Sequence, residues 1–174
     1  MTKRLETNRI IIHCSAEPPG RISGAADIRR WHLAKGWRDV GYHYVIRTNG
    51  IVERGRHIDD VGAHTKNENA DSIGVCLIGG LDEDWKPSAD YYTAAQWEAL
   101  ERLVRELRAE YKSVDLEVAG HNQFAAKACP CFDVPKWWAR VEVTTTEEVA
   151  NCAGCGDTFE IDDEPPTGNG LLPL

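Results

Sequence analysis

Two continuous apolar runs constrain the fold of this chain more than any other feature. The first, RIIIHCSA (residues 9–16), is rich in β-branched residues and precedes a Pro-Pro-Gly turn; the second, SIGVCLIGG (72–80), ends in a glycine pair. Uninterrupted runs of this length, bounded by turn residues, are typical of strands that are buried on both faces. Because helices usually cover such strands, the sequence predicts an α/β core.

The spacing of apolar and capping residues predicts three helices. One covers residues 23–36, with Ser23 as its N-cap. A longer one begins with a capping box, in which Thr93 pairs with Gln96, and then carries a single apolar stripe. The run VPKWWARVE predicts a short last helix with a proline in its first turn.

The order of the elements predicts a single domain. Thr48, Asn49 and Gly50 separate two short apolar runs and indicate a β-hairpin between the first helix and the second buried strand. Strand, helix, hairpin, strand, helix, loop and helix together predict an α/β domain over residues 1–143, with a central mixed sheet flanked by helices. Residues 144–174 are acidic and rich in Thr, Gly and Pro, which predicts a disordered or poorly packed tail.

The distribution of charge limits the class of partner. The net charge is −8, but residues 141–174 contain eight acidic side chains and no Lys or Arg, so the rest of the chain has 20 basic and 20 acidic residues. A neutral body argues against a nucleic-acid partner, which would need a basic face. No run approaches the roughly 20 apolar residues of a membrane span, and the basic N-terminus lacks the apolar run of a signal peptide. We therefore expect a cytoplasmic protein without a membrane partner.

The six cysteines of a chain without a leader are expected to be reduced thiols or metal ligands rather than a disulfide framework. Cys14 and Cys76 lie within the two buried strands, where a thiol behaves as a small apolar side chain. Cys152 and Cys155 form a C-x-x-C in the tail, which is half of a zinc-ribbon knuckle without a second half. A tail metal site, a local disulfide and a disordered tail all remain open.

Three residues offer the ligand types that zinc prefers. His13 ends the first buried strand, and His121 and Cys129 follow the longest helix in a loop. Two imidazoles and one thiolate would leave a fourth tetrahedral position open for water, as in a catalytic site. The chain has six histidines, however, so spacing alone leaves open whether these residues bind a metal or only pack.

Four motifs carry a family resemblance. IIIHCSA, IRRWHLAKGWRDVGYHYVI, NADSIGVCLIGG and AAKACPCFDVPKWW resemble, in the same order, motifs of the zinc-dependent N-acetylmuramoyl-L-alanine amidases, over residues 9–140. That family includes phage lysozymes, peptidoglycan recognition proteins and cytosolic muropeptide-recycling amidases. The resemblance implies one Zn²⁺ ion, held by His13, His121 and Cys129.

The resemblance also implies roles for residues that would otherwise be read as packing or solvated side chains. It makes Tyr42 and Lys127 catalytic: Lys127 would stabilise the oxyanion, and Tyr42 would orient the attacking water or take its proton. It places substrate contacts in the loop that holds His64. The bond cleaved would be the amide between the muramoyl lactyl group and L-alanine.

Cys131 departs from the family pattern, because the phage enzyme it resembles has a serine there. Residues on either side of a proline in an extended segment point the same way, so both Cys129 and Cys131 would face the metal. A second thiolate would displace the water that an active amidase needs. The sequence therefore predicts Cys129 as the only thiolate ligand.

These expectations combine into a monomeric endolysin that acts on peptidoglycan. It would reach the wall from the host cytoplasm after another protein has permeabilised the membrane. A cytosolic recycling amidase is the first alternative. The second alternative is a binding protein, either a peptidoglycan sensor without catalysis or an inhibitor of a phage RNA polymerase. Cys129 argues against the sensor. Inhibition of a polymerase is a role that one phage lysozyme of the resembled family also has.

Overall fold

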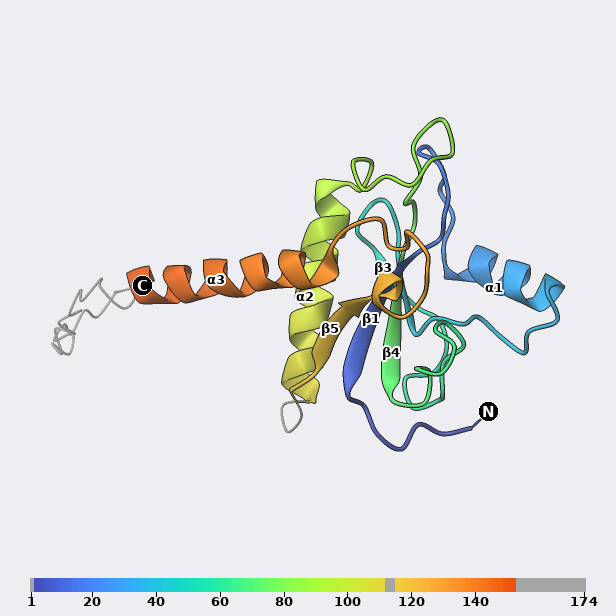
Figure 1. Ribbon diagram of the computed structural model, residues 1–174, viewed down its shortest axis with the longest axis horizontal. Helices are drawn as coiled ribbons and strands as arrows, with labels where there is room; N and C mark the ends of the chain where they lie inside the picture. The colour runs from blue at the N-terminus through green and yellow to red at the C-terminus, as the bar shows by residue number, and fades with distance from the viewer. Residues whose placement is uncertain (1, 112–114, 153–174) are drawn as a thin grey trace, which may run out of the picture.

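The computed structural model describes residues 2–111 and 115–152, which form an α/β sandwich around one five-stranded sheet (Figure 1). The strands are β1 (Arg9–Cys14), β2 (Tyr44–Ile46), β3 (Val52–Arg54), β4 (Ser72–Leu77) and β5 (Glu117–Gly120). The helices are α1 (Ala25–Ala34), α2 (Ala94–Glu110) and α3 (Val134–Cys152), and a 3-10 turn, η1 (His121–Gln123), follows β5 directly. The predicted fold class is confirmed.

The sheet is mixed, with strand order β3-β2-β4-β1-β5. The two apolar runs become β1 and β4, which lie side by side and parallel; β5 pairs parallel to the other edge of β1, and β2 pairs parallel to β4. Among the five strands of the described residues, only the predicted hairpin, β2 with β3, is an antiparallel pair. Because three parallel strands meet around β1, their carboxyl ends lie together at one edge of the sheet.

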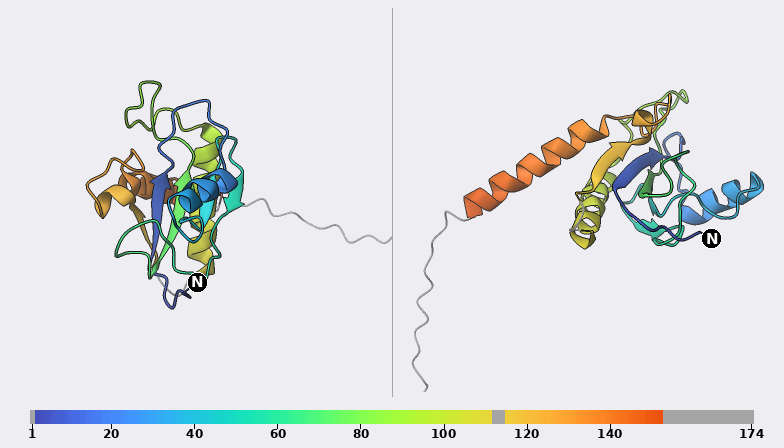
Figure 2. Two further views of the ribbon diagram at one scale, coloured as in Figure 1. Left: turned by 90° about the vertical axis from the view of Figure 1, so that its right-hand side faces the viewer. Right: turned by 60° about the horizontal axis from the view of Figure 1, so that its bottom comes forward.

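The two faces of the sheet carry separate apolar clusters, which is why β1 and β4 are buried on both sides. The larger cluster packs α2 and the first turns of α3 against one face, including Leu100, Trp137 and Trp138. The smaller cluster packs Ile28 of α1 against the opposite face, beside Cys76. The views in Figure 2 show α1 and α2 on opposite sides of the sheet.

Two local expectations differ from the structure. The N-cap of α1 is Gly24, not Ser23: the Ser23 hydroxyl donates to Glu17 Oε1 at 2.6 Å, while Glu53 of β3 accepts from the Ala25 N–H, also at 2.6 Å. The Glu53 carboxylate thus accepts a hydrogen bond from the Ala25 N–H, a first-turn group that an N-cap side chain would otherwise satisfy. Strand β5 was not predicted, because four residues are too few for a clear alternation of apolar and polar side chains.

The last helix is longer than the sequence predicts. It runs past residue 142 to Cys152 because no proline or glycine interrupts the chain before Gly154. Figure 1 shows α3 pointing away from the sheet. Cys152 is the last residue of α3, and Cys155 lies outside the described residues, as does most of the predicted tail. No described helix combines the length and the apolar character that crossing a membrane requires.

Truncation after residue 143 is expected to leave a folded, active protein. Val134, Trp137 and Trp138 are the buried residues of α3 up to residue 144, and all lie upstream of the cut. Arg105, which donates to the Val141 carbonyl at 2.9 Å, keeps this bond as well. Thermal melting and digestion of purified sacculi by the truncated and full-length chains test the expectation. Loss of both stability and digestion would show that the segment containing Cys152 and Cys155 belongs to the fold.

Candidate metal centre and cavity

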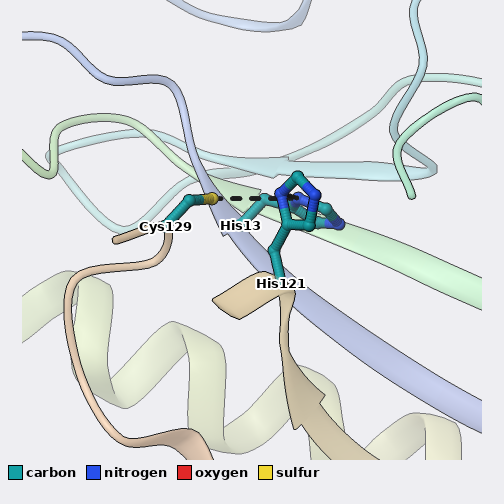
Figure 3. Close-up of side chains that lie close together, drawn as sticks. All are labelled: His13, His121 and Cys129. Carbon is teal, nitrogen blue, oxygen red and sulfur yellow. Dashed lines mark hydrogen bonds between the residues drawn. The ribbon is translucent and has the colours of Figure 1, made fainter. Parts of the chain in front are cut away.

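Parallel pairing brings the first two predicted ligands together. His13 is the penultimate residue of β1, and His121 is the first residue after β5; the register pairs Ile12 with Gly120, so the two histidines emerge beside each other. Cys129 comes from the loop between η1 and α3 and approaches from the other side (Figure 3). The carboxyl edge of parallel strands is also where α/β proteins usually bind ligands.

The distances within this cluster suit a small, soft cation. His13 Nδ1 lies 3.1 Å from His121 Nδ1 and 3.9 Å from Cys129 Sγ, and one ligand atom from each of the three residues lies within 4.8 Å of the others. Zinc–ligand bonds at tetrahedral angles put two nitrogens about 3.3 Å apart and nitrogen and sulfur about 3.6 Å apart. The residues present therefore fit a zinc ion without rearrangement of the backbone.

The protonation of the cluster favours cation binding. Burial, followed by the neighbouring His64 and His121, lowers the pKa of His13 well below its usual range. Burial and then the Lys127 ammonium also lower the pKa of His121. Neutral imidazoles have a lone pair to offer. The adjacent Cys14 thiol and burial raise the pKa of Cys129, so a bound cation would be needed to hold its thiolate.

Tyr42 and His43 precede β2 and point to different surroundings. The Tyr42 ring lies against His13, with ring centroids 5.1 Å apart. Burial, and next the Cys76 thiol, raise the pKa of Tyr42 well above its usual range, which keeps a phenolic proton in place. His43 instead accepts from the Gly74 N–H at 2.9 Å through Nδ1 and contacts the Asp60 carbonyl through Nε2.

Lys127 and His64 border an open cavity of about 520 Å³ beside the cluster. Its walls are the loop after residue 62 and the loop after β5, together with Trp37. The lining residues are Trp37, Ala63, His64, Thr65, Lys66, Asn69, His121, Phe124, Ala125 and Lys127. His121 thus belongs to both the cluster and the cavity wall. A ligand in the cavity would meet the exposed Lys127 and, through His121, one side of the cluster.

The expectation that Cys129 and Cys131 point the same way is wrong. Cys131 has φ of +74° and donates its N–H to the Ala128 carbonyl, so the segment is a turn and not an extended chain. Its thiol donates to the Gly80 carbonyl at 2.9 Å. Among the described residues, only Cys129 joins the two histidines in a metal-ligand group, and Cys131 does not.

One contact of the cluster was missed at the sequence level. The Thr65 hydroxyl is buried and lies 3.3 Å from His13 Nε2, the nitrogen that faces away from Cys129. His64 Nδ1 lies 3.0 Å from the same atom. A threonine in a polar loop has no local signal for such a role, because the loop reaches His13 only after the chain has folded.

A mixed sheet that carries two imidazoles and a thiol at its carboxyl edge, beside an open cavity, is an arrangement that can hold a metal ion for hydrolysis. The comparison with known families shows a hydrolase. The chain belongs to the N-acetylmuramoyl-L-alanine amidase family, whose sequence model matches residues 3–132.

Similar proteins span nearly the same length. The endolysin of Klebsiella phage KP32 is 46% identical over 146 residues, 84% of this chain and 95% of that protein; the endolysin of Escherichia phage T7 is 43% identical, over 83% and 94%. The solved amidase LysCS from Clostridium intestinale has a TM-score of 0.68 at 24% identity, over 83% of this chain and 87% of that one. A complex of peptidoglycan recognition proteins LCa and LCx with tracheal cytotoxin has a TM-score of 0.63 at 29% identity, over 75% and 79%.

Proposed function

We propose that this chain is an endolysin that hydrolyses the amide bond between N-acetylmuramic acid and L-alanine in peptidoglycan, using one Zn²⁺ ion held by His13, His121 and Cys129. The observation that carries the proposal is the convergence of these three side chains within 4.8 Å beside an open cavity. Family membership and the phage endolysins, which match this chain over almost their whole length, support the reaction and the biological role.

The three ligands leave a fourth tetrahedral position for chemistry. A zinc ion held there would lower the pKa of water to about 7 and polarise the scissile carbonyl. His13 and His121 contribute neutral nitrogens, and Cys129 contributes the negative charge that keeps the ion in place. Cys14 supports this thiolate, because its backbone N–H donates to Cys129 Sγ at 3.2 Å.

Lys127 and Tyr42 act on the amide from the protein side. Attack on the carbonyl places a negative charge on its oxygen, and a fixed ammonium stabilises a charge that is absent from the ground state. Lys127 suits this role, because its charge already affects both histidines and it borders the cavity. Tyr42, held protonated by burial, suits hydrogen-bond donation to the attacking water or to the carbonyl better than proton abstraction.

The cavity is proposed to bind the glycan–peptide junction of peptidoglycan, with His64 in its wall. The likeness to recognition proteins that were solved with tracheal cytotoxin supports a substrate of this class. The proposed site of action is the cell wall, reached by a monomer after membrane permeabilisation. Inhibition of a phage RNA polymerase remains a prediction of the resemblance and would use a surface outside the metal centre.

The test combines zinc content with product release. Purified protein is expected to contain about one zinc per chain and to release stem peptides from intact sacculi, and a chelator should abolish the release until zinc is restored. Soluble muropeptides serve as the comparison substrate. Activity on fragments but not on sacculi would favour a recycling amidase, and protein without zinc or activity would refute the proposal.

A further inference from the structure

The His64 imidazole is enclosed on the side away from the cavity. A Cβ atom on Gly62 or on Gly74 of β4 would lie 2.5 Å from His64 Cδ2, so the ring fills the space that these glycines leave. The backbone N–H groups of His64 and Thr65 both donate to Asn69 Oδ1, at 2.8 and 2.9 Å. Packing and hydrogen bonds therefore hold the ring in one place before any ligand arrives.

The ring contacts the far side of the first metal ligand. His64 Nδ1 lies 3.0 Å from His13 Nε2, while His13 Nδ1 faces His121 and Cys129. A neutral imidazole carries its proton on one nitrogen and a lone pair on the other. The groups that face His13 Nε2, which are His64 Nδ1 at 3.0 Å and the Thr65 hydroxyl at 3.3 Å, therefore decide whether Nδ1 can bind a cation.

A chain of hydrogen bonds defines the direction of donation. The Glu68 carbonyl can only accept, so the Ser72 hydroxyl donates to it. Ser72 Oγ, 3.5 Å from His64 Nε2, can then accept from that nitrogen. A proton on His64 Nε2 leaves His64 Nδ1 as an acceptor, which faces His13 Nε2 at 3.0 Å and the Thr65 hydroxyl at 3.1 Å. A lone pair on His13 Nε2 would face the lone pair of His64 Nδ1 at 3.0 Å, so the favoured arrangement places the proton on His13 Nε2.

We propose that His64 is a positioning residue that holds His13 in the tautomer with a proton on Nε2 and a free lone pair on Nδ1. The zinc identity of the cation rests on the proposed function, but the tautomer is a property of the protein without metal. A histidine ligand usually donates its second N–H to a fixed partner, and loss of that partner typically weakens metal binding about 10–100-fold. This role extends beyond the substrate contact expected for His64.

The tautomer is measured directly by ¹⁵N NMR of the imidazoles in the zinc-free protein. His13 is expected to be protonated on Nε2 in the wild-type chain and to become a mixture of tautomers in His64→Ala. His57→Ala, which removes an exposed histidine in the segment that follows β3, is the matched control and should leave His13 unchanged. A wild-type His13 protonated on Nδ1, or a His13 tautomer that is the same in His64→Ala as in the wild type, would overturn the proposal.

Zinc affinity, measured by competition with a chelator, gives a second readout. His64→Ala should weaken zinc binding about 10–100-fold, whereas His64→Asn should recover most of the affinity because its amide oxygen takes the place of Nδ1. Gly74→Ala should weaken binding while retaining the histidine, since the added methyl displaces the ring. If Asn binds zinc as poorly as Ala, the ring only fills space and the proposal fails. Wild-type protein that binds no zinc would refute the proposed function instead, and the NMR result would still decide the tautomer.

Discussion

Cys129→Ser is expected to lose both zinc and amidase activity, while Cys131→Ser retains both. A serine hydroxyl is not ionised at neutral pH and is a poor ligand for zinc, so the first substitution leaves two neutral imidazoles without a compensating negative charge. The loss of zinc affinity should exceed roughly 100-fold, which is the upper end of the range for losing a hydrogen-bond partner of a metal ligand. The second substitution keeps a donor at the Gly80 carbonyl, because a serine hydroxyl can replace the thiol.

Metal analysis and sacculus digestion of the two mutants separate the possibilities. Each thiol has a defined neighbour, His13 for Cys129 and Gly80 for Cys131, so the two substitutions form a matched pair only two residues apart. The reverse pattern would mean that Cys131 is the ligand and that the loop rearranges around the ion. Equal loss in both mutants would indicate a closed structural site with no position for water.

Lys127→Ala should reduce amidase turnover about 100-fold or more while zinc content and thermal stability stay at wild-type values. The side chain is exposed and its removal leaves no buried cavity, so the fold has no reason to change. The reduction should appear in kcat more than in KM, because the charge that Lys127 stabilises exists only in the transition state.

Lys66→Ala is the control for this experiment. Lys66 is also exposed and lines the same cavity, but it comes from the loop after residue 62 and not from the loop that holds Cys129. Because Lys66 lines the proposed substrate cavity, its loss should raise KM and leave kcat near the wild-type value. Near wild-type turnover of zinc-loaded Lys127→Ala, or an equal reduction in both mutants, would show that Lys127 contributes only general positive charge to the cavity.

Features encoded within a few neighbouring residues could be read from the sequence. The apolar runs correctly predicted β1 and β4, and the turn around Asn49 correctly predicted the hairpin. Thr93 caps α2 as expected, with its hydroxyl accepting from the Gln96 N–H at 3.1 Å. These signals are reliable because capping, turn geometry and strand burial depend on side chains only a few positions apart.

Features that depend on distant partners were decided by the tertiary structure. Glu53 replaces Ser23 as the partner of the first turn of α1, and β5 exists because the edge of β1 is available to pair with four residues. The turn that carries Cys131 to Gly80 follows from the packing of the loop after β5, and no local pattern distinguishes it from an extended segment.

The candidate site also combines features that the sequence indicates with features that only the tertiary structure sets. The family resemblance of their motifs implied that His13, His121 and Cys129 are zinc ligands, and this assignment stays a prediction. Their convergence required β1 and β5 to pair in parallel, which brings nitrogens 108 positions apart in the chain to within 3.1 Å. The orientation of His64 depends on space left by Gly62, just before it in the chain, and by Gly74 of β4, and on a contact with His13 across the sheet edge. Sequence determines which groups are present, but the direction in which an imidazole presents its lone pair is set only by neighbours that folding brings to it.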